Sequence, residues 1–145
     1  MKHISMAFLL LFFLSPAQAN CWNYAANKFN ISPELLYAIA QQESSLDPAA
    51  VGHNRDGSQD LGLMQINTRH LAQLNKLGIG RQQLHQPCTS IIIGASILAD
   101  MMKRYGYTWE AVGAYNAGTG ADRHGKRMLY AKKVWLRYQK IKKTI

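Results

Sequence analysis

The sequence predicts a single α+β domain in which helices dominate and strands are confined to one small β-hairpin. Three observations support this prediction. Apolar residues recur three and four positions apart over several stretches, as they do in amphipathic helices. The clearest hairpin signal is the Asp56-Gly57 turn within residues 54–58. No long linker, internal repeat or low-complexity tract divides the 145 residues.

Residues 1–19 have the pattern of a secretory signal peptide. A positively charged start precedes an apolar run over residues 4–14, and the small-x-small sequence Ala17-Gln18-Ala19 follows. The run is shorter than the ~20 apolar residues that a membrane-spanning helix needs, so the alternative is a retained amphipathic anchor. We predict cleavage after Ala19 and a mature domain of residues 20–145.

The helix that contains Glu43 has the strongest local signals. It is predicted to begin at Ser32-Pro33-Glu34, which combines a capping hydroxyl, an early proline and an acid in the first turn. Leu35, Ile39 and Glu43 share one of its faces at four-residue spacing. Pro48 prevents the helix from continuing.

The other predicted helices follow from similar patterns of apolar spacing and capping. Caps are expected at Asn67-Thr68, at Thr89 or Ser90, and at Thr108. A glycine-rich loop over residues 118–125 precedes the last helix. The helices are expected over residues 21–29, 68–76, 91–105, 109–116 and 126–142.

The chain is strongly basic. It has 17 Lys and Arg against 8 Asp and Glu, a net charge of +9, and removal of residues 1–19 takes away only Lys2. Such a surface attracts polyanions. An exported protein does not normally meet nucleic acid, so acidic cell-wall polymer and anionic lipid are the candidate partners. We expect no nucleic-acid binding, no stable insertion into a membrane, and a monomer.

The two cysteines, Cys21 and Cys88, are predicted to form a disulfide, because an even count in an exported chain favours pairing. Closing so long a loop would stabilise the fold by about 4 kcal/mol in the chain-entropy account. Two buried free thiols are the alternative. The five histidines show no ligand spacing, so no metal site is predicted.

Glu43 is a candidate catalytic acid. It ends an apolar stripe and lies in the last turn of its helix, so burial and the helix dipole both favour the neutral carboxyl and raise its pKa. A carboxyl that keeps its proton can donate it to the leaving oxygen of a glycosidic bond. The alternative is an ordinary acid that faces water, as we expect for Glu34.

Asp60 is a second candidate, because it precedes a segment that alternates amide and apolar side chains. Gln65 and Asn67 alternate with Met64 and Ile66, so one face presents amides while the other enters the core. Side-chain amides commonly hold the hydroxyl groups of sugars. The alternative for Asp60 is a solvent-exposed hairpin acid.

Four motifs follow one another along the chain: Glu43-Ser44, Gly62-Leu63-Met64-Gln65-Ile66-Asn67, Ala114-Tyr115-Asn116-Ala117-Gly118 and Tyr130-Ala131. Together they resemble the motifs of the lysozyme-like soluble lytic transglycosylases. The resemblance covers essentially all of residues 20–145, and it is strongest with small, single-domain, exported members that accompany type III or type IV secretion and conjugation systems. It implies a lysozyme-like fold in the periplasm of a Gram-negative bacterium.

The same resemblance implies a reaction. The family cuts peptidoglycan between N-acetylmuramic acid and N-acetylglucosamine, without a metal or an organic cofactor. The muramic acid's own 6-hydroxyl displaces the leaving group and leaves a 1,6-anhydro end. Such an enzyme would open the wall locally for a secretion or conjugation apparatus, one of whose components is the expected protein partner.

Site residues are also carried over from the resemblance. Glu43 is the general acid and then the general base, and Tyr130 places its hydroxyl near it. Tyr115 and Asn116 hold the sugar beside the cleaved bond. Ser44 and Gln65 line the cleft, Gly62 lets the glycan approach the backbone, and Met64 packs beneath it; the amide of Asn67 belongs to the same binding face.

The stretch from Glu43 through Asp60 to Asn67 also resembles the active site of C-type lysozymes. In those enzymes a second carboxylate acts as nucleophile or stabilises positive charge. Typical soluble transglycosylases work with one glutamate, so Asp60 leaves a lysozyme-type hydrolase open as an alternative. Two cysteines cannot supply the lysozyme disulfide framework. A non-catalytic, wall-binding assembly protein is the remaining alternative.

The predicted last helix concentrates positive charge. This is either an ordinary solvated face or a surface that is attracted to the acidic wall or membrane, or that docks to a secretion component. Its basic residues are Lys126, Arg127, Lys132, Lys133, Arg137, Lys140, Lys142 and Lys143.

Overall fold

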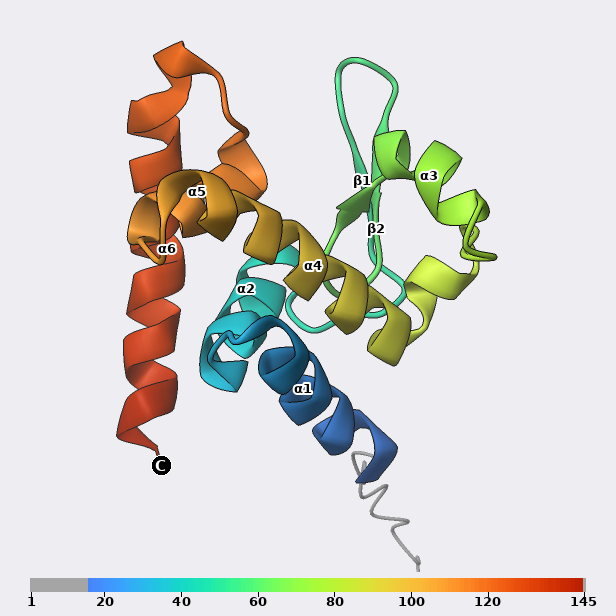
Figure 1. Ribbon diagram of the computed structural model, residues 1–145, viewed down its shortest axis with the longest axis horizontal. Coiled ribbons are helices and arrows are strands. Elements are labelled where there is room, and N and C mark those ends of the chain that lie inside the picture. The colour runs from blue at the N-terminus through green and yellow to red at the C-terminus, as the bar shows by residue number, and fades with distance from the viewer. Residues whose placement is uncertain (1–15, 145) are drawn as a thin grey trace, which may run out of the picture.

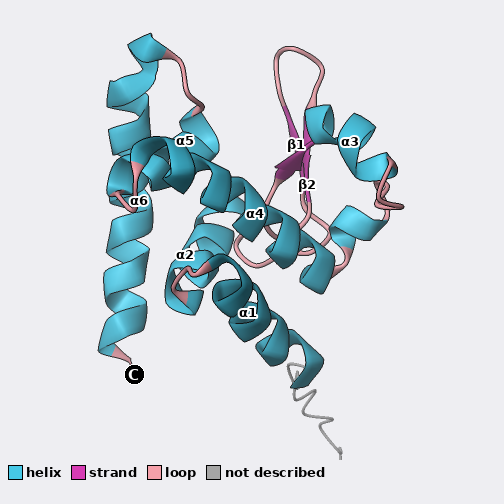
Figure 2. Ribbon diagram, in the orientation of Figure 1, coloured by secondary structure: helices cyan, strands magenta, loops and turns pink. Residues whose placement is uncertain are grey.

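The computed structural model describes residues 16–144 (Figure 1). Helices dominate this part of the chain, and the strands are confined to one small sheet (Figure 2), which confirms the predicted α+β class. The α-helices are α1 (Pro16–Phe29), α2 (Pro33–Ser44), α3 (Leu71–Asn75), α4 (Pro87–Tyr105), α5 (Trp109–Ala117) and α6 (His124–Lys143). The strands are β1 (Val51–His53), β2 (Gln59–Leu61) and β3 (Ile66–Asn67).

Most of the predicted signal peptide, residues 1–15, lies outside the described residues. Helix α1 begins at Pro16, upstream of the predicted cleavage point after Ala19. Cleavage there stays a prediction. Within residues 16–144, no helix combines the length and the apolar character needed to cross a bilayer.

Helix α2 forms as its sequence predicts. The Ser32 hydroxyl accepts a hydrogen bond from the Leu35 amide, and Pro33 occupies the first turn. The apolar stripe is buried, with Leu36 and Ile39 fully inside the protein. The helix ends because Ser45 and Leu46 adopt left-handed backbone angles, with φ of 54° and 64°.

The sheet has one strand more than the predicted hairpin. Its three antiparallel strands lie in the order β1-β2-β3, and Asp60 on the central strand pairs with Gly52 on one side and Asn67 on the other. The third strand forms because the chain turns back at Gln65, which has a φ of 52°.

Several helix boundaries differ from the predictions, among them three that follow the sheet in the sequence. Helix α4 begins at Pro87, because proline suits the first turn, and neither Thr89 nor Ser90 is its cap. The helix expected after Asn67 is divided into a 3₁₀ turn, Thr68–His70, and the short helix α3. The glycine-rich loop contains another 3₁₀ turn, Ala121–Arg123, so α6 starts at His124.

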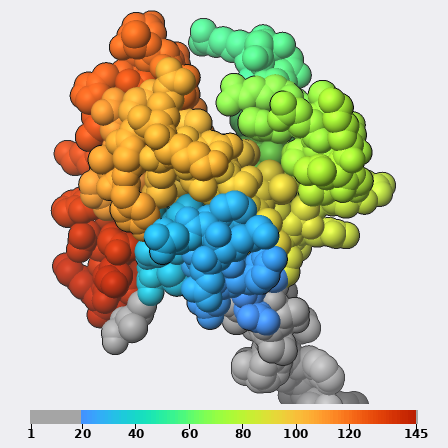
Figure 3. Space-filling model, viewed as in Figure 1, coloured from blue at the N-terminus to red at the C-terminus, as the bar shows by residue number. Residues whose placement is uncertain are grey.

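Helix α4 crosses the middle of the molecule, with α5 and α6 on one side and the strands and α3 on the other (Figure 1). In the space-filling view a hollow separates these two sides (Figure 3). The predicted disulfide between Cys21 and Cys88 is present, with Cα atoms 5.4 Å apart, and ties α1 to the start of α4. The largest fully buried apolar side chains are Leu36, Ile39, Leu61, Met64, Ile66, Leu84, Ile91, Leu98 and Val134.

Helices α5 and α6 pack very closely where Gly113 faces the backbone of Arg127. A Cβ atom at Gly113 would overlap the Arg127 carbonyl group. This approach requires glycine even though Gly113 lies within a helix, where glycine is normally unfavourable. The contact holds α6, and therefore Tyr130, at its distance from α5.

We predict that Gly113→Ala destabilises the protein by about 1–3 kcal/mol, the usual cost of overpacking, despite the better helix propensity of alanine. Urea unfolding followed by circular dichroism measures the change. Gly125→Ala is the matched control, because a Cβ there meets no atom within 4 Å, and it should be neutral or stabilising. Equal stability of the two variants would show that α5 and α6 do not need this close contact.

Candidate active site

Glu43 lies at the end of α2 and meets a side chain from α6. Its Oε1 atom accepts a hydrogen bond of 2.5 Å from the Tyr130 hydroxyl, across 87 residues of sequence. Tyr130 is buried, with 7% of its surface exposed. The prediction that Tyr130 places its hydroxyl near Glu43 therefore agrees with the geometry.

Burial dominates the electrostatics of Glu43. Loss of solvent raises the pKa of its carboxyl from 4.5 to about 7, the Tyr130 hydrogen bond opposes this, and the negative charge of Asp60 adds to it. Burial also raises the pKa of Tyr130 well above 10, so the phenol keeps its proton and remains a donor. This shift has the direction that the sequence predicted for Glu43. Glu34 differs as expected, because the Ser32 hydroxyl lowers the pKa of its carboxyl.

Asp60 is held by amides from both sides. Asn54 Nδ2 donates to Oδ2 at 3.0 Å, and Asn67 Nδ2 donates to Oδ1 at 2.9 Å. The side-chain oxygen Oδ1 of Asn67 in turn accepts a hydrogen bond from the backbone amide of Arg69. Both Asp60 oxygens act as acceptors, as those of a carboxylate do. Its position in the middle of the sheet fixes the direction of its side chain.

Glu43 and Asp60 line the same cavity, which has a volume of about 280 Å³. Walls from α2, the sheet and α5 meet there, with Ile97 of α4 between them. Of the predicted binding residues, Gln65, Asn67, Tyr115 and Asn116 line it as well. The other lining residues are Asn54, Asp56, Ser58, Ile66, Arg69 and His70.

The loop between β2 and β3 is held in place by several side chains. The Tyr115 hydroxyl donates to the Met64 carbonyl at 2.6 Å, and the Met64 amide donates to the buried Ser90 hydroxyl at 3.0 Å. Gln65 donates through Nε2 to the carbonyl oxygens of Gly62 and Ala50, at 3.0 and 3.3 Å. Tyr115 and Gln65 therefore shape the cavity wall as well as facing the cavity.

Ser44 and Gly62 have other positions than the resemblance implied. Ser44 does not line the cavity; its hydroxyl donates to the Leu63 carbonyl at 2.8 Å, because neighbouring residues of a helix point about 100° apart. Gly62 has a φ of +76°, and a Cβ there would overlap the Leu84 carbonyl oxygen. Glycine is therefore required by a contact inside the protein, and Gly62 itself does not line the cavity.

Met64 belongs to the core. It is fully buried, and a Cβ added at Gly94 of α4 would lie 2.7 Å from its Cε atom. Its side chain thus packs against α4 and does not line the cavity, and its predicted place beneath the glycan stays a prediction.

Several cavity residues were not predicted as site residues. Ser58 could have been found, because it directly precedes β2 and lies two positions before Asp60, and side chains two apart in an extended chain share a face. Asn54 lies at the predicted turn and reaches the cavity through the pairing of β1 with β2. Arg69 and His70 reach it through the pairing of β2 with β3, for which the sequence has no local signal. Within residues 16–144, no cluster of three or more His, Cys, Asp or Glu side chains could hold a metal ion. The prediction of a reaction without metal or cofactor stays a prediction.

Comparison with known proteins agrees with this geometry. Residues 20–137 match the family described as "Transglycosylase SLT domain". The chain belongs to this family. The match spans every element that contributes to the cavity, and it places the chain among the peptidoglycan lytic transglycosylases.

Relatives of this SLT domain include two proteins of similar length. "Invasion protein IagB" of Salmonella typhimurium is 58% identical over 143 residues, which are 98% of this chain and 89% of that protein. "Protein IpgF" of Shigella flexneri is 42% identical over 136 residues, which are 92% of this chain and 90% of that protein.

A solved structure shares the fold of the SLT domain. An inactive glutamate-to-glutamine mutant of the lytic transglycosylase Slt from Pseudomonas aeruginosa aligns with a TM-score of 0.67 and 25% identity. The alignment covers 84% of this chain but only 23% of that much longer one. The expected lysozyme-like fold is confirmed by this match.

We predict that NMR titration of the Glu43 carboxyl finds a pKa near 7, and that Tyr130→Phe raises it further, because the lost hydrogen bond favoured the charged form. Tyr138→Phe, the same change elsewhere on α6, should leave it in place. A wild-type pKa near 4.5 would contradict the proposed burial of this carboxyl.

A second prediction concerns stability against pH. The folded state binds the Glu43 proton more tightly than the unfolded state does. The contribution of this proton to the free energy of unfolding is therefore fully present below pH 4.5, and it is lost as the pH rises to about 7. The loss should approach about 3 kcal/mol. Glu43→Gln has no such titration. The unfolding free energy of the wild type should therefore fall relative to that of this variant over that range.

Glu34→Gln is the control for this experiment. The pKa of Glu34 is lowered in the folded protein, so its contribution is present above its unfolded pKa and lost as pH falls. The difference between wild type and this variant should therefore change in the opposite direction. A pH-independent difference for Glu43→Gln would mean that Glu43 is solvated.

Proposed function

We propose that Glu43 is the general acid, and then the general base, of a lytic transglycosylase that cuts the β-1,4 bond between N-acetylmuramic acid and N-acetylglucosamine. The observation that supports this most is a buried carboxyl with a pKa of about 7 that lines a polar cavity. At neutral pH roughly half of such groups are protonated, so both roles are accessible to it.

In the first step, protonated Glu43 donates its proton to the bridging oxygen as the bond from that oxygen to the anomeric carbon breaks. Positive charge develops on the anomeric carbon, and the Asp60 carboxylate in the same cavity stabilises it. Tyr130 keeps its hydrogen bond to Glu43 and so stabilises the carboxylate that has just formed.

In the second step, the muramic acid's own 6-hydroxyl attacks the anomeric carbon. The Glu43 carboxylate accepts the hydroxyl proton, and a 1,6-anhydro end forms without consumption of water. Glu43 is then protonated again and ready for the next bond. The remaining polar lining, Gln65, Asn67, Tyr115 and Asn116, is the proposed binding surface for the sugar rings.

A lysozyme-type hydrolase remains the second candidate, because Asp60 faces the cavity together with Glu43. In that reaction Asp60 would act as nucleophile or stabiliser, and water would complete the cleavage. A non-catalytic wall-binding protein has less support, since it would have no use for a glutamate with so high a pKa at the edge of a polar cavity.

We further propose that the protein acts in the periplasm of a Gram-negative bacterium, where it opens the wall for a secretion or conjugation apparatus. The support is its 58% identity to a protein named for invasion, over 98% of the chain, together with the predicted signal peptide and the disulfide. The fold is stabilised by that disulfide in the oxidising compartment where the wall lies.

Mass spectrometry of digested sacculi tests the chemistry. We expect anhydro-muramic ends, which are lighter than reducing ends by one water. Glu43→Gln should lower turnover about 10³-fold or more, and Asp60→Asn by about 10²-fold. Glu34→Gln, the same substitution at the other end of α2, should retain full activity. Products with only reducing ends would favour the hydrolase, and full activity of Glu43→Gln would refute both enzymatic mechanisms.

A further inference from the structure

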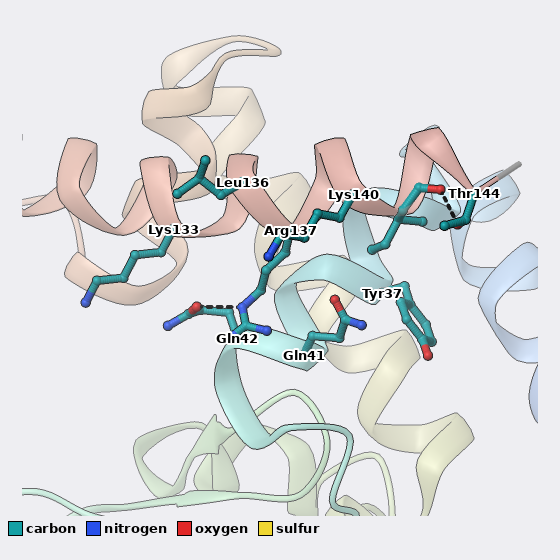
Figure 4. A pocket seen from close by; sticks show the side chains of 9 residues that line it. Tyr37, Gln41, Gln42, Lys133, Leu136, Arg137, Lys140 and Thr144 are labelled. Atoms are coloured by element: carbon teal, nitrogen blue, oxygen red, sulfur yellow. Dashed lines mark hydrogen bonds between the residues drawn. The ribbon is translucent and has the colours of Figure 1, made fainter.

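A second hollow lies away from the active-site cavity, along the line where α2 and α6 pack together. It has a volume of about 660 Å³ and no lining residue in common with the active-site cavity. Figure 4 looks into it: Lys133 and Arg137 extend from α6, and Gln42 of α2 faces them. We call it the α2–α6 groove.

The charge of the groove is one-sided. Lys133, Arg137 and Lys140 line it at positions i, i+4 and i+7, which places them in a row on one helix face. Among the described residues that line it there is no carboxylate. Helix α6 as a whole has eight Lys and Arg and no acid.

These charges are not neutralised within the described chain. In residues 16–144, the one ion pair made by a Lys or Arg of α6 joins Arg127 to Glu110, far from the groove. Arg137 instead donates from Nε to the neutral Gln42 amide oxygen at 2.9 Å. Three cations in one row therefore lack anionic partners, and bringing them together costs electrostatic repulsion that an anion would relieve.

The groove also offers apolar surface. Tyr37, Leu136 and Ile141 line it, and Leu136 is 48% exposed. From Lys133 to Thr144 the helix rises about 16 Å, the length of about five residues of an extended peptide. Acids at alternate positions of such a peptide lie about 6.6 Å apart, against a rise of about 6.0 and 4.5 Å between successive cations along the helix. The long side chains of Lys133, Arg137 and Lys140 can span this difference.

We infer that the α2–α6 groove is a docking site for an acidic segment of a partner protein, in which carboxylates alternate with large apolar side chains. Charge complementarity selects the acids, and Tyr37, Leu136 and Ile141 select the apolar residues. A bilayer surface is too flat to fill a groove between two helices. Stem peptides of the wall carry carboxylates but lack large apolar side chains.

The site is placed to affect catalysis without taking part in it. Gln42 directly precedes Glu43, and Lys133 follows Tyr130 by one turn of α6. A segment bound in the groove would contact both helices that bring Glu43 and Tyr130 together. The docking itself does not depend on the proposed reaction, since it uses other residues.

NMR titration tests the proposal. The probe is an acetylated heptapeptide of alternating aspartate and leucine, added to the ¹⁵N-labelled protein at about 50 mM salt, where screening is weak. We expect amide shifts along α2 and α6 around Tyr37, Gln41 and Lys140. The same peptide with asparagine in place of aspartate should not bind.

Two double variants make the test specific. Lys133→Glu with Lys140→Glu should weaken binding about tenfold or more, since two attractive pairs become repulsive. Lys132→Glu with Lys143→Glu makes the same change of charge on the same helix outside the groove, and should weaken binding only about twofold. Cleavage of soluble wall fragments should be equal in the two variants, so a failed docking site and a failed enzymatic mechanism give different results.

Several results would overturn the inference. Equal loss of binding in both double variants would mean attraction to net charge alone. Shifts confined to the active-site cavity would place the peptide there. Groove shifts of equal size from an isolated stem tetrapeptide, or from phosphatidylglycerol vesicles, would assign the surface to the wall or to the membrane. Absence of groove shifts with the acidic heptapeptide would also refute it.

Discussion

The hydrogen bond between Tyr130 and Glu43 joins α6 to α2, two helices that are far apart in sequence, at a partly buried position. The carboxyl can be buried at the end of α2 only because a neutral donor meets it there, since a buried carboxyl without a partner would be costly. Burial raises the pKa of the carboxyl, and the hydrogen bond from Tyr130 lowers it and so stabilises the charged form. The close packing of α5 on α6 at Gly113 holds that donor in position.

The need to hold Glu43 in place also explains the side-chain hydrogen bonds around the β2–β3 loop. Ser44, Ser90 and Tyr115 each hydrogen bond to backbone of residues 63–64, from three different helices. The loop is therefore held in a fixed position against the end of α2. Asp60, on the strand that enters this loop, is thereby held in the same cavity as Glu43.

Features with local causes were predictable from the sequence. The cap, the proline and the apolar stripe of α2 all lie within residues 32–44. They predicted the position of Glu43 in its helix and the direction of its pKa change. Contacts between distant segments were not. Ser90 resembles a helix cap, but its hydroxyl is used by Met64, and Gly62 is required by Leu84, which lies 22 positions later. Arg69 and His70 reach the cavity through the pairing of β3 with β2; the alternation over residues 64–67 indicated an extended segment but not its partner strand.

The disulfide between Cys21 and Cys88 makes the stability of this fold depend on the redox conditions around the protein. It fastens α1 onto α4, the helix that crosses the middle of the molecule, so the crosslink supports the scaffold behind both walls of the cavity. Cytoplasmic thiol systems keep such cysteines reduced. For a protein that is exported as proposed, the chain reaches its full rigidity only after translocation, and the disulfide then stabilises the enzyme in the compartment where its polymer lies.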